Sequence, residues 1–128
     1  MSFFKNILLF YNDEFAGIKS EVTRLVRKNQ ARLKVIDVFD NFDQYLELLP
    51  SSSSIDELKE VIISERRLEI IGHFETDPDI SSQMTVIFKF GNPVIEIIKE
   101  AIRGEHDLVI KAASGNKTLK DHLFGNIA

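Results

Sequence analysis

Short unbroken runs of apolar residues recur along the chain, and the stretches between them carry apolar residues three or four positions apart. The runs span residues 7–11, 33–39, 84–90 and 108–112. A short run without alternation is typical of a strand that is buried on both faces of a parallel sheet. Val35, Ile36 and Val38 are β-branched residues, which strands favour. The pattern therefore predicts four strands.

The stretches between the runs have the spacing of amphipathic helices. Their apolar stripes are Phe15, Ile18, Val22, Leu25 and Val26; then Leu58, Val61, Ile62, Leu68 and Ile71; then Val94, Ile97, Ile98 and Ala101. Shorter helical segments are expected at residues 40–49 and 118–124, and a turn at residues 76–79. Each strand is thus followed by helical sequence.

Helix-capping residues set the expected helix ends. Ser54 and Glu57 have the spacing of a capping box. Asn92 is placed as an N-cap, with Pro93 at the first helical position, where its missing N–H has no helical partner to lose. Gly104 is expected to close that helix in the left-handed conformation.

The alternating order of strands and helices contains no hairpin signal. Such an order implies parallel strands joined by right-handed crossovers. We therefore expect one α/β domain over residues 1–128, with an open, doubly wound, Rossmann-like parallel sheet.

Composition and charge narrow the function classes. The 128 residues carry a formal net charge of −4 and no cysteine. An acidic chain argues against a dedicated nucleic-acid binder, and the absence of cysteine excludes disulfides, thiolate catalysis and cysteine-bound metal. No apolar run approaches the length of a membrane span, and the start lacks the features of a signal peptide. We expect a cytoplasmic protein with no membrane partner.

Catalytic and metal-binding patterns are weak. His73, His106 and His122 are not spaced as metal ligands, so no metal site is expected. The helical glutamates are expected at surface positions; they are Glu57, Glu60, Glu65, Glu69, Glu96 and Glu100. No Walker loop or nucleophile elbow occurs.

The C-terminal third resembles the universal stress protein family. Gly91-Asn92-Pro93 matches the Gly-x-Pro that opens the third helix of that family, and Asp107-Leu108-Val109-Ile110 matches its fourth strand. The spacing of its glycine loop is kept at Ala112, Gly115 and Gly125-Asn126. The chain is most similar to the first domain of tandem family members of the E type. The resemblance implies an adenine nucleotide alpha-hydrolase-like sheet with strand order 3-2-1-4-5.

The resemblance also implies a nucleotide crevice where the first and fourth strands end side by side. ATP-binding relatives wrap the phosphates with the glycine loop and contact the nucleoside with an Asp after the first strand, which here falls on Asn12. The residues expected to line this crevice are Asn12, Asp13, Val38, Ala112, Gly115, Gly125 and Asn126.

Three residues depart from the pattern of ATP-binding relatives. Ala112 adds a methyl group where the backbone approaches phosphate, Asn126 replaces a hydroxyl, and Asn12 lacks a charge. Each lost contact is worth roughly 1–3 kcal/mol, so together they would weaken binding by about 10² or more. We therefore expect a non-enzymatic stress-response domain with a degenerate crevice and no required cofactor. The alternative is a switch that binds ATP with Mg²⁺, and slow ATPase activity is left open.

The fifth strand of the family pattern has no counterpart before Ala128. The chain is expected to be either truncated at its C-terminus or the first half of a tandem protein. The edge left open by a missing strand is a template for pairing with another chain. A second copy or a second domain of the same family is therefore the expected partner.

Overall fold

The structure is a computed structural model that describes residues 3–40, 47 and 54–112. The helix expected at 118–124 lies outside these residues, as does nearly all of the segment expected at 40–49. Gly115, Gly125 and Asn126 of the expected crevice also lie outside them.

A parallel sheet runs through the centre of the domain. Its strands are β1 (Asn6–Phe10), β2 (Arg32–Phe39), β3 (Thr85–Phe90) and β4 (Leu108–Lys111). Within the described residues the order is β3-β2-β1-β4, and all three pairings are parallel. The predicted α/β fold class and the predicted strands are confirmed, and the order agrees with that of an open sheet in which β1 is central.

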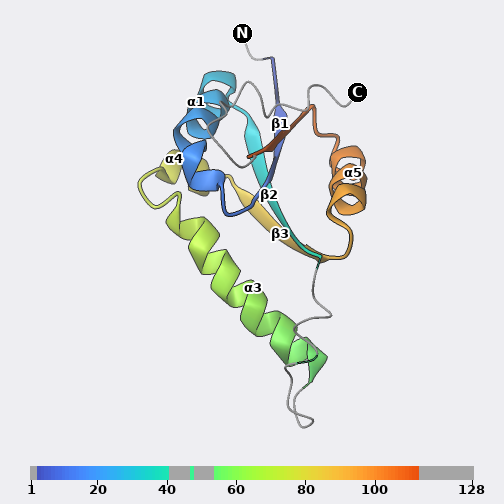
Figure 1. The fold of residues 1–128 in the computed structure, drawn as a ribbon. Helices are drawn as coiled ribbons and strands as arrows, with labels where there is room; N and C mark the ends of the chain where they lie inside the picture. Colours follow the sequence, from blue (N-terminus) through green and yellow to red (C-terminus); the bar gives the residue numbers. More distant parts are fainter. Residues whose placement is uncertain (1–2, 41–46, 48–53, 113–128) are drawn as a thin grey trace.

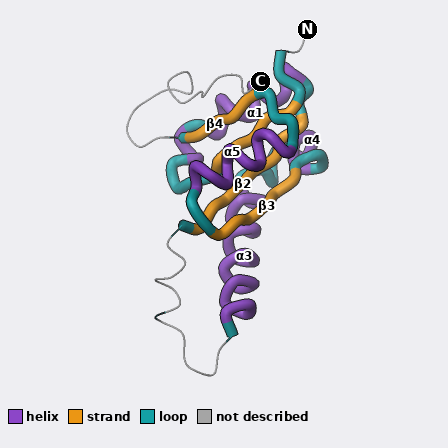
Figure 2. The backbone as a smooth tube through the Cα atoms, turned by 90° about the vertical axis from the view of Figure 1, so that its right-hand side faces the viewer, coloured by secondary structure: helices purple, strands orange, loops and turns teal. Residues whose placement is uncertain are grey.

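The helices cover both faces of this sheet (Figures 1 and 2). They are the short 3₁₀ helix η1 (Phe15–Gly17), α1 (Lys19–Asn29), α3 (Ile55–Gly72), α4 (Pro78–Ser81) and α5 (Pro93–Arg103). The helix predicted from the apolar stripe Phe15 to Val26 is therefore divided into η1 and α1. The turn expected at residues 76–79 includes the first residues of α4. The N-terminal half of α3 projects past the carboxyl ends of β2 and β3 (Figure 1).

Two apolar clusters hold the layers together. One joins α1, η1, α4 and the C-terminal end of α3 to one face of the sheet, with Phe15, Ile70 and Phe74 each at most 1% exposed. The other joins α5 to the opposite face through Ala101 and Val109. Because β1 is covered on both sides, Ile7, Leu8 and Leu9 are all fully buried. This explains why its sequence is continuously apolar.

The predicted helix starts are confirmed by side-chain hydrogen bonds. The Ser54 hydroxyl accepts from the backbone N–H of Glu57 at 3.0 Å. The Asn92 side chain accepts from the N–H of Ile95 at 3.2 Å, with Pro93 in the first turn of α5. Each bond satisfies one of the N–H groups that a helix start leaves without a partner.

The expected apolar stripe of α3 is wrong in most of its positions. Val61, Leu68 and Ile71 are 54%, 74% and 41% exposed, whereas Ile70, outside the stripe, is fully buried. The reason is that much of α3 extends beyond the sheet, so only its C-terminal turn and Phe74 enter the core. Helical spacing identified the helix, but it could not say how much of it meets the sheet.

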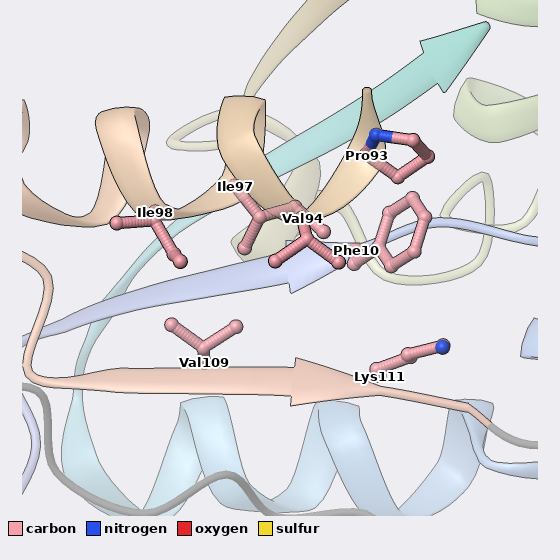
Figure 3. Close-up of a pocket in the computed structure, with 7 residues that line it drawn as sticks. All are labelled: Phe10, Pro93, Val94, Ile97, Ile98, Val109 and Lys111. Carbon is pink, nitrogen blue, oxygen red and sulfur yellow. The ribbon is translucent and has the colours of Figure 1, made fainter. Parts of the chain in front are cut away.

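The stripe of α5 is buried only in part. Ala101 is buried, but Val94 and Ile98 are 65% and 50% exposed. Together with Phe10 and Val109, these residues line an apolar hollow of about 250 Å³ between α5 and β4, shown in Figure 3. The remaining lining residues are Pro93, Ile97 and Lys111.

The C-terminal end of α5 differs from the prediction. Gly104 has a φ of −85° and Glu105 has the positive φ of 52° instead, so the left-handed residue is one position later. Gly104 is needed for close approach: a Cβ atom there would lie 2.4 Å from His106 Nε2. Glu100, expected at the surface, is buried and pairs with Lys34 at 3.0 Å. Strand β2 runs under α5 at this point, which sequence spacing could not show.

We predict that Gly104→Ala lowers the free energy of unfolding by about 1–3 kcal/mol, because the added methyl group displaces the buried His106 ring. Urea denaturation at neutral pH measures this. The matched control is Gly72→Ala at the end of α3, where a Cβ atom would meet nothing within 4 Å. Equal stability of the two variants would show that the close approach at Gly104 has no energetic weight.

Candidate functional site

The ends of β1 and β4 lie side by side at the point where the strand order reverses. Phe10 pairs with Lys111 in the register of these two strands. Ala112 is the next residue after Lys111, and Asn12 is the second residue after Phe10. The Asn12 side-chain amide donates to the Ala112 carbonyl at 2.7 Å. The Asn12 side-chain oxygen accepts from the N–H of Glu14 at 2.9 Å. Both polar groups of Asn12 are therefore engaged by the backbone of its own chain.

The other predicted crevice residues fall in different surroundings. Ala112 is 1% exposed and belongs to the core. The Val38 side chain is buried in the apolar cluster under α5, on the opposite face of the sheet from Tyr11. Asp13 is exposed and lies 3.4 Å from Arg66. The structure thus brings Asn12 and Ala112 together, and it places Asp13 beside a helix residue that the sequence did not single out.

Arg66 of α3 connects the carboxyl ends of β1 and β2. Its Nε atom lies 3.2 Å from Asp37 Oδ2, and its Nη1 atom lies 3.3 Å from Glu69 Oε2 and 3.4 Å from Asp13 Oδ1. The guanidinium carbon is 5.7 Å from the ring centres of Tyr11 and of Phe39. This cluster fixes α3 against the sheet with a cation held by carboxylates and aromatic faces.

Tyr11 joins α3 to β1 through a second set of contacts. Its hydroxyl donates to Glu69 Oε2 at 2.5 Å and lies 3.1 Å from His73 Nε2. The His73 ring packs edge-on against Phe15. Burial lowers the pKa of His73, with a further contribution from the charge of Lys19. Burial, aided by the hydrogen bond to Glu69, raises the pKa of Tyr11, so the hydroxyl keeps its proton and stays a donor.

Asp37 is the buried charge of this cluster. It is 4% exposed, and its Oδ2 atom accepts no hydrogen bond within the part of the chain described. Burial raises its pKa to about 6; Arg66 opposes the rise, whereas Glu69 and Asp13 add to it. At neutral pH the carboxylate is therefore ionised at an energetic cost that Arg66 only partly offsets.

A cavity of about 270 Å³ opens beside Arg66. It is lined by Asp13, Phe39, Ile62, Glu65, Arg66 and Glu69. The carboxylates come from the loop after β1 and from one face of α3. The walls are therefore anionic and partly aromatic, whereas a phosphate-binding site presents N–H groups and cations.

Sequence reasoning missed Tyr11, Asp37, Arg66 and Glu69. The one available signal was Asp37, a charged residue inside the apolar run 33–39. A charge at such a position is rare unless it has a partner. The partner could not be found from spacing, since Arg66 lies on a helix that crosses the end of the sheet.

The part of the chain that the structure describes contains no cluster of three or more His, Asp and Glu side chains arranged to hold a metal ion. None of its helices has the length and hydrophobicity required for crossing a membrane.

We predict that Asn12→Asp lowers the free energy of unfolding by about 1–3 kcal/mol. A carboxylate cannot donate, so its oxygen would face the Ala112 carbonyl oxygen without a shared proton. Chemical denaturation at pH 7 measures the loss. Asn92→Asp is the matched control, because the Asn92 side chain only accepts a hydrogen bond and Asp caps a helix equally well. An unchanged stability of Asn12→Asp would contradict the role assigned to this amide.

The raised pKa of Asp37 predicts a pH-dependent stability. Between about pH 4 and pH 6 the folded protein holds a proton that the unfolded chain has released, so the free energy of unfolding falls as pH rises through this window. Relative to Asp37→Asn, wild type should lose about 1–3 kcal/mol across it. Urea unfolding of both proteins at several pH values measures the difference. A difference that does not change with pH would contradict the prediction.

The fold of this chain is similar to that of a protein whose structure has been solved. The structure is similar to universal stress protein UspA from Lactobacillus plantarum, with a TM-score of 0.55 and 17% sequence identity, covering 87% of this chain and 78% of that chain. At this identity the likeness concerns the fold. No curated protein sequence matches the chain.

One protein-family model matches most of the sequence. The model of the universal stress protein family matches residues 19–128. The match includes the Gly91-Asn92-Pro93 motif and the segment Asp107-Leu108-Val109-Ile110. The chain belongs to the universal stress protein family.

Proposed function

We propose that this chain is a non-enzymatic stress-response domain whose nucleotide crevice has lost its ordinary ligand. The proposal rests on the hydrogen bond that the Asn12 side-chain amide donates to the Ala112 carbonyl. A residue at the end of β1 that serves a nucleoside needs polar groups directed at the ligand. Here one N–H of the Asn12 amide donates to the end of β4 and its oxygen accepts from the next turn, so half of its hydrogen-bonding capacity is directed at its own chain.

The charges beside the crevice support the same function. Asp13, Asp37 and Glu69 pair with the guanidinium of Arg66, and Glu65 lines the cavity beside it. A triphosphate brings several negative charges of its own, and like charges at close range raise the free energy of binding. The rings of Tyr11 and Phe39 are 3% and 8% exposed and each faces Arg66, so neither is open for stacking with a base.

The alternative is a domain that binds ATP with Mg²⁺ and acts as a switch. The adjacent ends of β1 and β4 favour it, because ligands of open parallel sheets bind at the point where the strand order reverses. In that case Gly115 and Gly125 would supply the phosphate contacts. In the described cluster the Tyr11 hydroxyl lies within hydrogen-bond reach of Glu69 and His73, but Tyr11 is 3% exposed, so this pairing does not favour an ATPase reaction.

In the proposed function the domain acts by assembly in the cytoplasm, with a second copy or with a second domain of a tandem protein of the E type. The exposed apolar side chains of α5 support an assembling role. Val94, Ile95, Ile98 and Ile102 are each at least half exposed. A contiguous exposed apolar surface of this kind is common where another protein chain binds.

Calorimetric titration with Mg-ATP tests the proposal. We expect no saturable heat up to about 1 mM, a concentration at which even a binding free energy of about −4.1 kcal/mol would be detected. Saturable binding that disappears in a Gly115→Val variant would instead establish the nucleotide switch. Release of inorganic phosphate in the same samples would support the slow ATPase.

A further inference from the structure

His106 is a buried titratable group at the edge of the sheet where the strands begin, opposite the edge that holds Asn12. It lies between the end of α5 and the start of β4 and is 5% exposed. Its backbone N–H donates to the Ala101 carbonyl at 2.9 Å. Both ring nitrogens are buried without a hydrogen-bond partner among the described residues. Such a ring is costly to bury, and a proton on it would raise that cost.

Two opposite charges face the His106 ring. Lys34 Nζ of β2 lies 3.0 Å from Glu100 Oε2 of α5, and His106 Nε2 lies 3.8 Å from the same oxygen. The Glu100 side chain is 5% exposed, so Lys34 already balances its buried charge. A proton on His106 would therefore place a second cation beside one buried carboxylate.

The other charged groups around the ring are directed elsewhere or lie at the surface. Arg32 and Glu105 line the same cavity as His106, and both are exposed. The Asp107 carboxylate accepts from the backbone N–H groups at the start of β1. From β1 itself, the backbone of Asn6 acts on the ring and favours its proton. The balance at His106 is thus set mainly by burial, Lys34 and Glu100.

These surroundings fix the direction in which acid acts. Burial lowers the pKa of His106 and the charge of Lys34 lowers it further, whereas Glu100 and the Asn6 backbone oppose the decrease. In the unfolded chain the ring has the ordinary pKa of about 6.5. The stability that the neutral ring contributes is therefore complete above that pH. It is lost as the pH falls below about 6.5 toward the lower pKa of the folded state.

The turn that carries His106 is tightly packed on one side and open on the other. A Cβ atom at Gly104 would lie 2.4 Å from His106 Nε2, so the ring is pressed against the backbone there. Glu105 has a φ of 52°, which is unfavourable for a residue with a side chain. A cavity of about 390 Å³, lined by Gly104, Glu105 and His106 among others, lies beside the turn. A charged ring can reach water through this cavity if the turn moves.

We propose that His106, Lys34 and Glu100 form an acid-sensitive device that releases the turn between α5 and β4. At neutral pH the uncharged ring packs against Gly104 and holds the end of α5 on the sheet. On acidification the protonated ring leaves the core through the cavity, and the hydrogen bonds of residues 104–107 open. The inference goes beyond the proposed function and does not depend on it, because the device lies at the other edge of the sheet from the crevice.

Amide hydrogen exchange of the full chain at pH 7 and pH 5 tests the device. The N–H groups of residues 104–107 donate to carbonyls of α5 and of Asn6. Their protection factors, which correct for the intrinsic pH dependence of exchange, should fall at least about fivefold at pH 5. The N–H of Tyr11, which donates to the Ile36 carbonyl in the centre of the sheet, should keep its protection within about twofold.

Three variants connect this fall to the three side chains. His106→Gln removes the titrating group, so the fall should disappear. Lys34→Met removes the cation that disfavours the proton, so the fall should begin at a higher pH than in wild type. Glu100→Gln removes the anion that favours the proton, so the fall should begin at a lower pH. NMR titration of the His106 ring should shift in the same two directions.

The matched control is His73→Gln, because burial also lowers the pKa of His73, which packs under α3 instead. Exchange at residues 104–107 should respond to pH in this variant as in wild type. Equal protection at pH 7 and pH 5 in wild type would overturn the inference, as would the same fall in His106→Gln. An equal fall at Tyr11 would also overturn it, since the whole protein would then be unfolding. If His106→Gln does not fold, Lys34→Met and Glu100→Gln still decide, because shifts that are not opposite would contradict the device.

Discussion

The parallel pairing of β1 with both β2 and β4 is the constraint on which the rest of the structure depends. Ile7, Leu8 and Leu9 are fully buried, so β1 has apolar neighbours on both faces and hydrogen-bonded neighbours on both sides. The pairing places the carboxyl ends of the strands at one edge. It thereby brings Asn12 to Ala112 and sets Tyr11 beside the end of β2.

The two edges of the sheet use polar contacts differently. At the amino end, the Asp107 carboxylate accepts from the N–H groups of Lys5 and Asn6, which ties the start of β1 to the start of β4. Lys34 and Glu100 form a largely buried pair beneath α5. Beside Glu100, both ring nitrogens of the buried His106 have no hydrogen-bond partner among the described residues. At the carboxyl end, Asp37 is ionised at a cost and the carboxylates outnumber Arg66, an imbalance of the kind found at binding sites.

Arg66 therefore has two structural roles. It holds the C-terminal part of α3 against the sheet, while the N-terminal part extends beyond the sheet with Val61 and other apolar side chains exposed. It also fills the space between Tyr11 and Phe39 with a cation. The cavity at this edge of the sheet is anionic, and the fold alone does not determine its ligand.

The sequence by itself determined the strands and the starts of α3 and α5 at Ser54 and Asn92, because these depend on local hydrophobic runs and on hydrogen bonds between near neighbours. The alternation of strands and helices indicated the parallel pairing. It also indicated the family and placed Asn12 and Ala112 at one site. Only the tertiary structure decided that Glu100 is buried, that Leu68 is exposed, and that Arg66 meets Asp37. The physical reason is that burial and ion pairing depend on where a helix crosses the sheet. Residues 37 and 66 share no periodicity from which that crossing could be read.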